Sequence, residues 1–188
     1  FNSGVGNKLN LRNSFLLVSQ HPVTTEYGDG EKQIYNTLKA VSKIGIQAIV
    51  LWPNADAGTE DIARGMRKWR ENEDTSQMHF FKNLPIKTYV KLMKRTACLI
   101  GNSSSGIREG AFIGTPCVNV GTRQTMREKG DNVIDVHFDE NEIFKAIKDQ
   151  IEHGPYDKNP IYGDGNAGKL IAEILSKKSV IIQKLITY

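Results

Sequence analysis

The sequence predicts an α/β protein built on a doubly wound parallel sheet, and three observations lead to this prediction. Apolar runs alternate with amphipathic segments at least five times along the 188 residues, a pattern typical of parallel sheets with helices on both faces. The apolar runs are continuous, as expected for strands that are buried on both faces. The composition, with 39% hydrophobic and 24% charged residues, is that of a globular chain.

The first elements follow from local chemistry. Residues 14–20 form a continuous apolar run and predict a strand. Residues 31–43 carry apolar side chains at helical spacing and end before a glycine, so they predict a helix. Residues 46–52 predict the second strand, and a charged helix follows over residues 59–71, where Thr59 is the expected cap.

The middle of the chain repeats this alternation. Residues 78–81 predict a short strand, and a helix over 85–94 begins at a proline. Four residues of that helix are expected to face the core: Ile86, Tyr89, Val90 and Met93. A strand over 97–100 then leads into a helix over 105–113. Its core-facing residues are expected to be Ile107, Ala111, Phe112 and Ile113.

Two strands and two helices complete the prediction. Residues 116–120 and 132–136 are apolar runs, and Asp139 is placed to cap a helix with isoleucine and alanine on one face. A loop rich in Gly, Pro and Asn over residues 154–165 precedes a last helix from about Asn166.

Composition disfavours several classes of function. The net charge of +4 is mild and the basic residues are interleaved with acidic ones, so nucleic-acid binding is not expected. No apolar run reaches the roughly 18 residues of a membrane span. The four histidines lack metal-ligand spacing. Cys98 and Cys117 fall in predicted buried strands, which suits free thiols in a reducing compartment and predicts a cytoplasmic protein.

The segment Gly101-Asn-Ser-Ser-Ser-Gly-Ile-Arg-Glu109 is the most informative in the chain. It joins a predicted strand to a predicted helix, where free backbone N–H groups and the helix dipole favour a phosphate. Glu109 lies one turn into that helix, where its carboxylate can accept bonds from ribose hydroxyls. The same residues also suit an ordinary helix cap at Ser104 or Ser105, followed by a surface glutamate.

Three other loops follow predicted strands, where ligands of doubly wound sheets bind. His21 can serve as acid, base or phosphate donor, or be a structural loop residue. Arg123 can hold a diphosphate through its planar guanidinium, or face solvent. The backbone of Lys82-Asn-Leu-Pro85 can read a base edge.

These groups form only half of a catalytic site. The first strand is not followed by Gly-x-Gly-x-x-Gly, and Gly-x-x-x-x-Gly-Lys-Ser/Thr is absent, which disfavours NAD binding and P-loop ATP hydrolysis. The sequence contains no carboxylate pair, triad or metal cluster that completes an active site. The other half is therefore expected from elsewhere.

Taken together, the loops closely resemble the C-terminal half of the UDP-N-acetylglucosamine 2-epimerase family. The matching motifs, in order, are Gln-His-Pro-Val-Thr-Thr at 20–25, Pro-Asn-Ala-Asp-Ala-Gly at 53–58, Gly-Asn-Ser-Ser-Ser-Gly-Ile-Arg-Glu at 101–109, Gly-Thr-Pro at 114–116, Gly-Thr-Arg-Gln at 121–124 and Ile-Tyr-Gly-Asp-Gly-Asn-Ala at 161–167. The resemblance runs from about Ser14 to about Ile174. It implies a glycosyltransferase-B-like architecture of two Rossmann-like domains with the nucleotide sugar between them.

The resemblance also implies roles for individual residues. Ser103, Ser104 and the helix start after them would bind the diphosphate of UDP, and Arg123 would pair with it. Glu109 would accept the ribose hydroxyls, and the backbone around Leu84 would read uracil. No metal or redox cofactor is implied.

The sequence His21-Pro-Val-Thr-Thr25 is similar to the hydrolysing branch, since non-hydrolysing members carry His-Arg-Arg-Glu-Asn there. That branch converts UDP-N-acetylglucosamine and water to N-acetylmannosamine and UDP, and opens sialic-acid-type biosynthesis. His21 would lie near the leaving phosphate. The carboxylates that move the C2 proton belong, in the family, to an N-terminal domain.

The expected organisation has three parts. Residues 1–13 are a linker from a missing N-terminal domain, residues 14–175 are the nucleotide-binding domain, and residues 176–188 are a C-terminal helix. That helix packs on the missing domain or on this one. The expected partners are the UDP-sugar, the missing domain and further copies of the protein. The chain alone is expected to bind nucleotide weakly and not to catalyse. A glycosyltransferase of the same architecture and a non-catalytic nucleotide-sugar binding module are the alternatives.

Overall fold

The computed structural model of the protein describes residues 4–178. The strands are β1 (Val5–Gly6), β2 (Phe15–Ser19), β3 (Gln47–Leu51), β4 (Met78–Phe81), β5 (Cys98–Gly101), β6 (Cys117–Val120) and β7 (Val133–Val136). The helices are α1 (Gly30–Lys43), α2 (Thr59–Asn72), α3 (Ile86–Met93), α4 (Ser104–Ile107), α5 (Glu109–Ile113), α6 (Glu140–His153) and α7 (Ala167–Lys177), with a 3₁₀ turn at Thr24–Glu26.

The strands form one sheet in the order β1-β4-β3-β2-β5-β6-β7. All neighbouring pairs are parallel except β1 with β4. From β2 the chain adds β3 and β4 on one side of the sheet, and from β5 it adds β6 and β7 on the other. β2 and β5 are therefore neighbours, with Leu16 opposite Cys98 and Ser19 opposite Gly101. The predicted doubly wound parallel sheet is therefore confirmed, and its switch point lies where β2 and β5 end.

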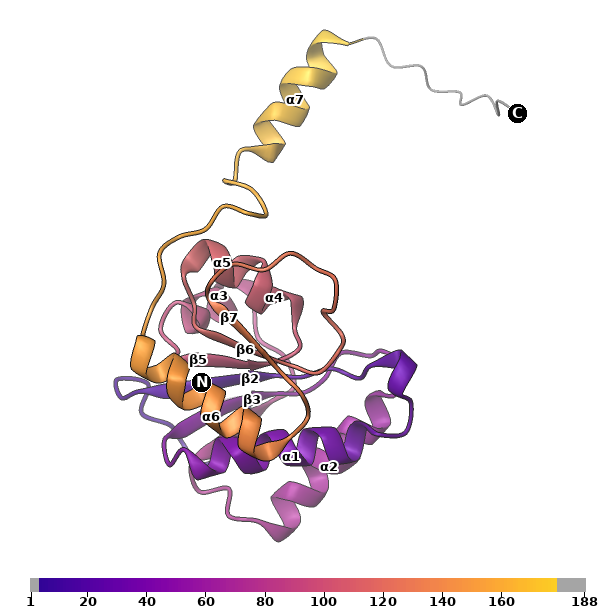
Figure 1. Ribbon diagram of the computed structural model, residues 1–188, viewed down its shortest axis with the longest axis vertical. Helices are drawn as coiled ribbons and strands as arrows, with labels where there is room; N and C mark the ends of the chain where they lie inside the picture. The colour runs from indigo at the N-terminus through magenta and orange to yellow at the C-terminus, as the bar shows by residue number, and fades with distance from the viewer. Residues whose placement is uncertain (1–3, 179–188) are drawn as a thin grey trace, which may run out of the picture.

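Two apolar cores cover the two faces of the sheet. One core joins strand residues such as Leu16 and Val18 to buried residues of α1, α2 and α6. The other contains Phe15, Leu17 and the end of α3. Figure 1 shows α1, α2 and α6 on one side of the sheet and α3, α4 and α5 on the other. Alternate residues of β2 enter opposite cores because successive side chains of a strand point to opposite faces.

The two cysteines are free and fully buried, as the sequence predicts. Burial raises the pKa of the Cys117 thiol to about 12, and the pKa of Cys98 is also raised well above its ordinary value by burial. Both thiols are therefore protonated near neutral pH. They occupy different cores, Cys98 with α6 and Cys117 with α3.

Several local predictions around α3, α4 and α5 are wrong. The expected helix over residues 105–113 is two short helices, because the backbone of Arg108 (φ −96°, ψ −78°) departs from helical geometry. The cap of α4 is Ser103, which precedes both expected positions, Ser104 and Ser105. Ile86 is 71% exposed and Phe112 is 36% exposed, so neither faces the core.

Of the caps predicted at Thr59 and Asp139, only Asp139 is found. Asp139 caps α6 by accepting hydrogen bonds from the N–H groups of Asn141 and Glu142, as predicted. The predicted cap Thr59 instead lies inside the first turn of α2, after Gly58. Its hydroxyl donates to the carbonyl oxygen of Asp56 at 2.6 Å, which fixes the loop after β3.

The two ends of the described chain differ in their contacts. β1 was not predicted: Val5 pairs with Phe80 and Gly6 with His79 at the edge of the sheet. α7 extends away from the sheet and its helices (Figure 1). Four large apolar residues of α7 are between 53% and 59% exposed: Leu170, Ile171, Ile174 and Leu175. Most of the predicted C-terminal element, residues 179–188, lies outside the described residues.

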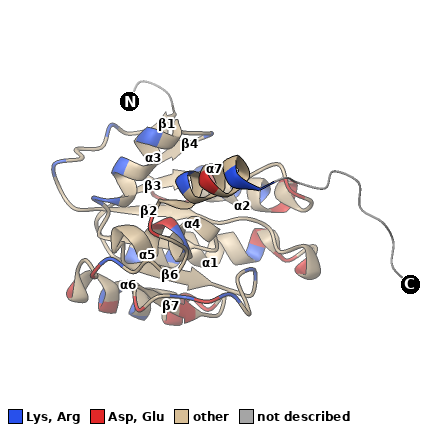
Figure 2. Ribbon diagram, turned by 90° about the horizontal axis from the view of Figure 1, so that it is seen from above, with Lys and Arg blue, Asp and Glu red and all other residues tan. Residues whose placement is uncertain are grey.

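Charged residues are interleaved over the helices, as Figure 2 shows for one view. Some join neighbouring helices: Lys39 of α1 lies 2.9 Å from Glu140 of α6, and Lys68 of α2 lies 3.0 Å from Glu31 of α1. Among residues 4–178, no helix is long and apolar enough to cross a membrane.

Candidate functional site

The loops after β2, β3, β5 and β6 meet at the carboxyl edge of the sheet, and Asn102 joins three of them. The N–H of His21 donates to Asn102 Oδ1 at 2.7 Å, and Asn102 Nδ2 donates to the His21 carbonyl oxygen at 2.9 Å. The carbonyl oxygen of Asn102 accepts from Arg123 Nη1 at 3.3 Å and from Gln124 Nε2 at 2.7 Å. Asn102 is fully buried. It therefore brings His21 and Arg123, predicted from separate loops, to one place.

His21 is buried, and its hydrogen bonds define its tautomer. The N–H of Asn54 donates to Nδ1 at 3.2 Å, so the neutral ring carries its hydrogen on Nε2. Nε2 lies 3.4 Å from the hydroxyl of Ser19. The pKa of His21 is lowered to about 4, mainly by burial and also by the Arg123 guanidinium, while the Asp56 carboxylate acts in the opposite direction. His21 is consequently a neutral hydrogen-bond donor near pH 7.

Arg123 bridges two loops at the same edge. Besides its bond to the Asn102 carbonyl oxygen, its Nη2 lies 3.5 Å from Asp56 Oδ2. Its side chain is 29% exposed, so the guanidinium remains accessible to a ligand. A planar guanidinium with donors left over suits an anion with two oxygens, such as a diphosphate.

Ser103 and Ser104 lie at the start of α4. The N–H groups of Ser103 and Ser104 donate to no acceptor in the part of the chain that the structure describes. The Ser103 hydroxyl lies 2.9 Å from the Ser105 hydroxyl, which in turn lies 2.6 Å from the hydroxyl of Tyr89. Because α4 is only four residues long, its dipole is small, and the groups here that can bind an anion are the N–H and hydroxyl donors themselves.

The other two predicted residues lie on the α3–α5 face. The carboxylate of Glu109 is exposed and makes no hydrogen bond or ion pair within residues 4–178. It lines a cavity of about 930 Å³ that also includes Val90 and Phe112. Leu84 is half-buried against the core under that face. The Leu84 N–H already donates to Asn83 Oδ1 at 2.8 Å, so only its carbonyl oxygen is free to read a base.

Sequence reasoning missed the residues that hold this site together. Asn102 and Gln124 are adjacent to predicted residues, and Asp56 belongs to a quoted motif, but none carried a predicted role. Gln20 and Gln124 also have buried side-chain atoms without a hydrogen-bond partner in the described residues. Such unsatisfied groups are expected where a bound water or ligand completes a site. The available signal was the density of Asn and Gln directly after apolar strands.

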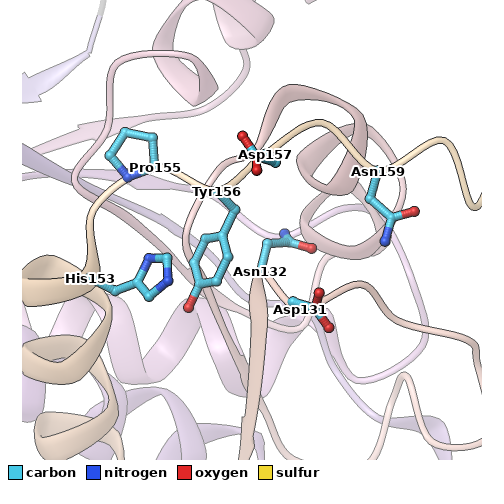
Figure 3. Close-up of a pocket in the computed structure, with 7 residues that line it drawn as sticks. All are labelled: Asp131, Asn132, His153, Pro155, Tyr156, Asp157 and Asn159. Carbon is cyan, nitrogen blue, oxygen red and sulfur yellow. The ribbon is translucent and has the colours of Figure 1, made fainter.

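A further pocket, of about 330 Å³, lies at the opposite end of the sheet (Figure 3). It is lined by Asp131 and Asn132, which precede β7, and by His153 at the end of α6. The rings of His153 and Tyr156 stack with centroids 3.8 Å apart. This pocket is remote from the carboxyl edge and shares no residue with the candidate site.

Comparison with known proteins relates most of the chain to one family. The profile of the family described as UDP-N-acetylglucosamine 2-epimerase matches residues 2–176. The UDP-N-acetylglucosamine 2-epimerase of Neisseria meningitidis serogroup B is 31% identical over 146 residues, which cover 78% of this chain and 38% of that protein. The UDP-N,N'-diacetylbacillosamine 2-epimerase (hydrolyzing) of Legionella pneumophila is 30% identical over 159 residues, covering 85% of this chain and 41% of that protein.

Solved structures give the same fold. The crystal structure of UDP-GlcNAc 2-epimerase from Neisseria meningitidis bound to UDP-GlcNAc superposes with a TM-score of 0.70 at 17% sequence identity. The superposition covers 90% of this chain and 46% of that one. The chain thus spans less than half the length of the relatives that it matches.

Proposed function

The chain belongs to the UDP-N-acetylglucosamine 2-epimerase family, and we propose that it supplies the nucleotide-binding half of a hydrolysing member. The proposed reaction converts UDP-N-acetylglucosamine and water to N-acetylmannosamine and UDP. The observation that carries the proposal is the convergence of His21, Arg123 and the start of α4 around Asn102. Hydrogen-bond donors from three loops meet at the carboxyl edge of the sheet, at the switch point where doubly wound sheets bind ligands.

The proposed ligand lies across this edge. Its diphosphate accepts bonds from the Arg123 guanidinium, from the free N–H groups of Ser103 and Ser104, and from the Ser104 hydroxyl. Its ribose hydroxyls donate to the Glu109 carboxylate, which has no partner of its own among the described residues. Its uracil contacts the backbone at Leu84. Each assignment uses a group that the fold leaves available.

His21 acts in this proposal as a hydrogen-bond donor to the leaving phosphate. The reaction breaks the C1–O bond and removes the C2 proton, so that UDP leaves and a 2-acetamidoglucal forms. Addition of water then gives C1 its hydroxyl and C2 a hydrogen in the opposite configuration. A neutral ring with its hydrogen on Nε2 supports stabilisation of the departing charge by a fixed donor. The C2 proton is moved by carboxylates outside this chain.

Two observations support the hydrolysing branch. The loop after β2 reads His21-Pro-Val-Thr-Thr25, and the Legionella relative is itself described as hydrolyzing.

The buried protonated thiols of Cys98 and Cys117 support a cytoplasmic enzyme. No metal or redox cofactor enters the proposed reaction.

The proposed organisation places residues 14–175 as the nucleotide-binding domain, residues 1–13 as a linker and the C-terminal segment against an N-terminal domain. The exposed apolar side chains of α7 support the last point, because a helix with such a face is stable in water only when it is covered. The full-length protein is proposed to form homo-oligomers.

The direct test is a calorimetric titration of the 188-residue chain with UDP and, in parallel, with GDP. Saturable binding that favours UDP supports the proposal and directs the assay to release of N-acetylmannosamine by the full-length protein. Preference for GDP would change the nucleotide, and binding of neither would contradict the assigned site. Transfer to an acceptor, without N-acetylmannosamine, would instead indicate a glycosyltransferase.

The assigned donors make a specific prediction about UDP affinity. The double substitution Ser103→Ala with Ser104→Ala, or Arg123→Ala alone, is expected to weaken UDP binding by about 1–3 kcal/mol, the usual value for hydrogen bonds to charged groups. Arg127→Ala is the matched control, because Arg127 is an exposed arginine of the same loop. Unchanged UDP affinity in both test variants would contradict the placement of the diphosphate at this edge.

A further inference from the structure

Two stretches of the chain carry basic residues and no acidic ones. Residues 1–25 contain Lys8 and Arg12 but no Asp or Glu. Residues 75–108 contain six Lys and Arg residues, again without an Asp or Glu, although the whole chain has 21 acidic residues. The long helices α1, α2 and α6 each carry charges of both signs. The two stretches are therefore exceptions to the interleaving of charges in this protein.

Tertiary contacts bring the two stretches together on one side of the sheet. Leu9 and Leu11 pack on the apolar core that Met93 of α3 also enters. Arg95, just after α3, donates from Nη2 to the carbonyl oxygen of Leu11 at 2.7 Å. Residues 7–13 therefore lie beside α3, and the two stretches without acidic residues adjoin on the surface.

The side chains that face solvent on this surface are basic. Lys87, Lys91 and Lys94 recur at helical spacing and lie on the exposed side of α3, opposite the residues that enter the core. Figure 2 shows α3 with blue segments and no red. We define the basic face as Lys8, Arg12, Lys87, Lys91, Lys94 and Arg95. All of these residues are exposed, and none forms an ion pair within residues 4–178.

We propose that the basic face docks on an anionic lipid bilayer. Each Lys or Arg near such a bilayer is attracted by its negative surface potential, and this attraction requires no shaped pocket. Since no carboxylate of the described residues is paired with the basic face, its whole charge is available to lipid headgroups. Ile86 at the start of α3 adds an apolar side chain that is 71% exposed beside Lys87. Surfaces that combine basic and apolar side chains bind at the membrane interface without a spanning helix.

The make-up of the basic face favours a lipid surface over other polyanions. Specific protein interfaces have a buried centre rich in aromatic residues, and single-stranded nucleic acids stack their bases on aromatic rings. The one aromatic residue of α3, Tyr89, is half-buried, and its hydroxyl lies 2.6 Å from that of Ser105. Residues 7–13 contain no aromatic residue. Lysine, which predominates on the basic face, is a point charge on a flexible stem and suits a surface of many mobile headgroups.

The test measures binding of the 188-residue chain to sedimented vesicles. Vesicles of phosphatidylglycerol and phosphatidylcholine in equal parts should bind the chain, and vesicles of phosphatidylcholine alone should not. NaCl at about 1 M, which screens charges beyond about 3 Å, should release the bound protein. The triple substitution Lys8→Gln, Lys87→Gln and Lys91→Gln should lower the partition coefficient about 100-fold, since each charge contributes about fivefold.

The matched control replaces three exposed lysines on the other side of the sheet: Lys32 of α1, and Lys145 and Lys148 of α6, each by Gln. This control loses the same net charge and should bind the mixed vesicles nearly as well as the original chain. Thermal melting followed by circular dichroism should be unchanged in both variants, because every substituted residue is exposed.

Three results would each overturn the proposal. The first is a lack of binding to the mixed vesicles, and the second is an equal loss of binding in the two triple variants. The third is tighter binding to a single-stranded oligonucleotide than to the mixed vesicles at the same salt concentration, which would make the basic face a nucleic-acid site. None of these results bears on the nucleotide site, because the basic face was inferred from charge and packing without it.

Discussion

Gly101→Ala is expected to destabilise the protein by about 3 kcal/mol or more, because two costs combine at this residue. Gly101 ends β5 with φ +129°, a conformation that residues with a side chain rarely adopt. A Cβ atom there would lie 2.2 Å from the carbonyl oxygen of Ser19, an atom of the paired strand that cannot move aside. Such a loss is a large part of the 5–15 kcal/mol that typical domains have in total.

Urea unfolding of Gly101→Ala, followed by circular dichroism, measures this effect. Gly28→Ala is the matched control, because Gly28 also has a positive φ (+96°) but no atom within 4 Å of the added Cβ. The control should lose only the conformational cost, about 1–2 kcal/mol. Equal losses in the two variants would show that the close approach of β2 and β5 does not constrain Gly101.

The pH dependence of stability should depend on His21. Its pKa is about 4 in the folded protein against an ordinary value of 6.5, so the unfolded chain binds a proton that the folded chain does not. The free energy of unfolding contributed by this difference is fully present above pH 6.5. It is lost as the pH falls from about 6.5 to about 4, by about 3 kcal/mol in total.

His21→Asn removes this contribution while keeping an acceptor for the Asn54 N–H. Unfolding free energies of the two proteins, measured from pH 7.5 to 4.5, should therefore converge as the pH falls. Carboxylates that titrate in the same range are common to both proteins, so their effects cancel in the difference. Parallel curves would show that His21 is not held neutral by burial.

Local residue chemistry determined most of the secondary structure. The strands are identifiable because a strand covered on both faces must be apolar throughout, as Phe15–Ser19 shows. The order of strands and helices follows, and with it the parallel sheet. The sequence also directed attention to the loops after the strands, because ligands of such sheets bind there. Position after a strand left His21 and Arg123 open to a functional or a structural reading, and the family resemblance assigned the roles of His21, Ser103 and Arg123.

Other features depend on contacts between residues far apart in the chain, and no local pattern encodes them. Asn102 is hydrogen-bonded to His21, which lies 81 residues earlier in the sequence. Its place at the centre of the candidate site becomes clear only once β2 and β5 are known to be adjacent. The sequence left open whether His21 is charged; burial and Arg123 decide that it is neutral.

The sequence by itself therefore determined the fold class, the family and the residue types at the carboxyl edge of the sheet, because these depend on local pattern and motif order. Only the tertiary structure decided that Arg108 interrupts the helix after β5, that Asp56 contacts Arg123 and that Thr24 and Thr122 line one pocket. The physical reason is that geometry and electrostatics at this edge arise from four loops packed together, and each loop's sequence specifies only its own part.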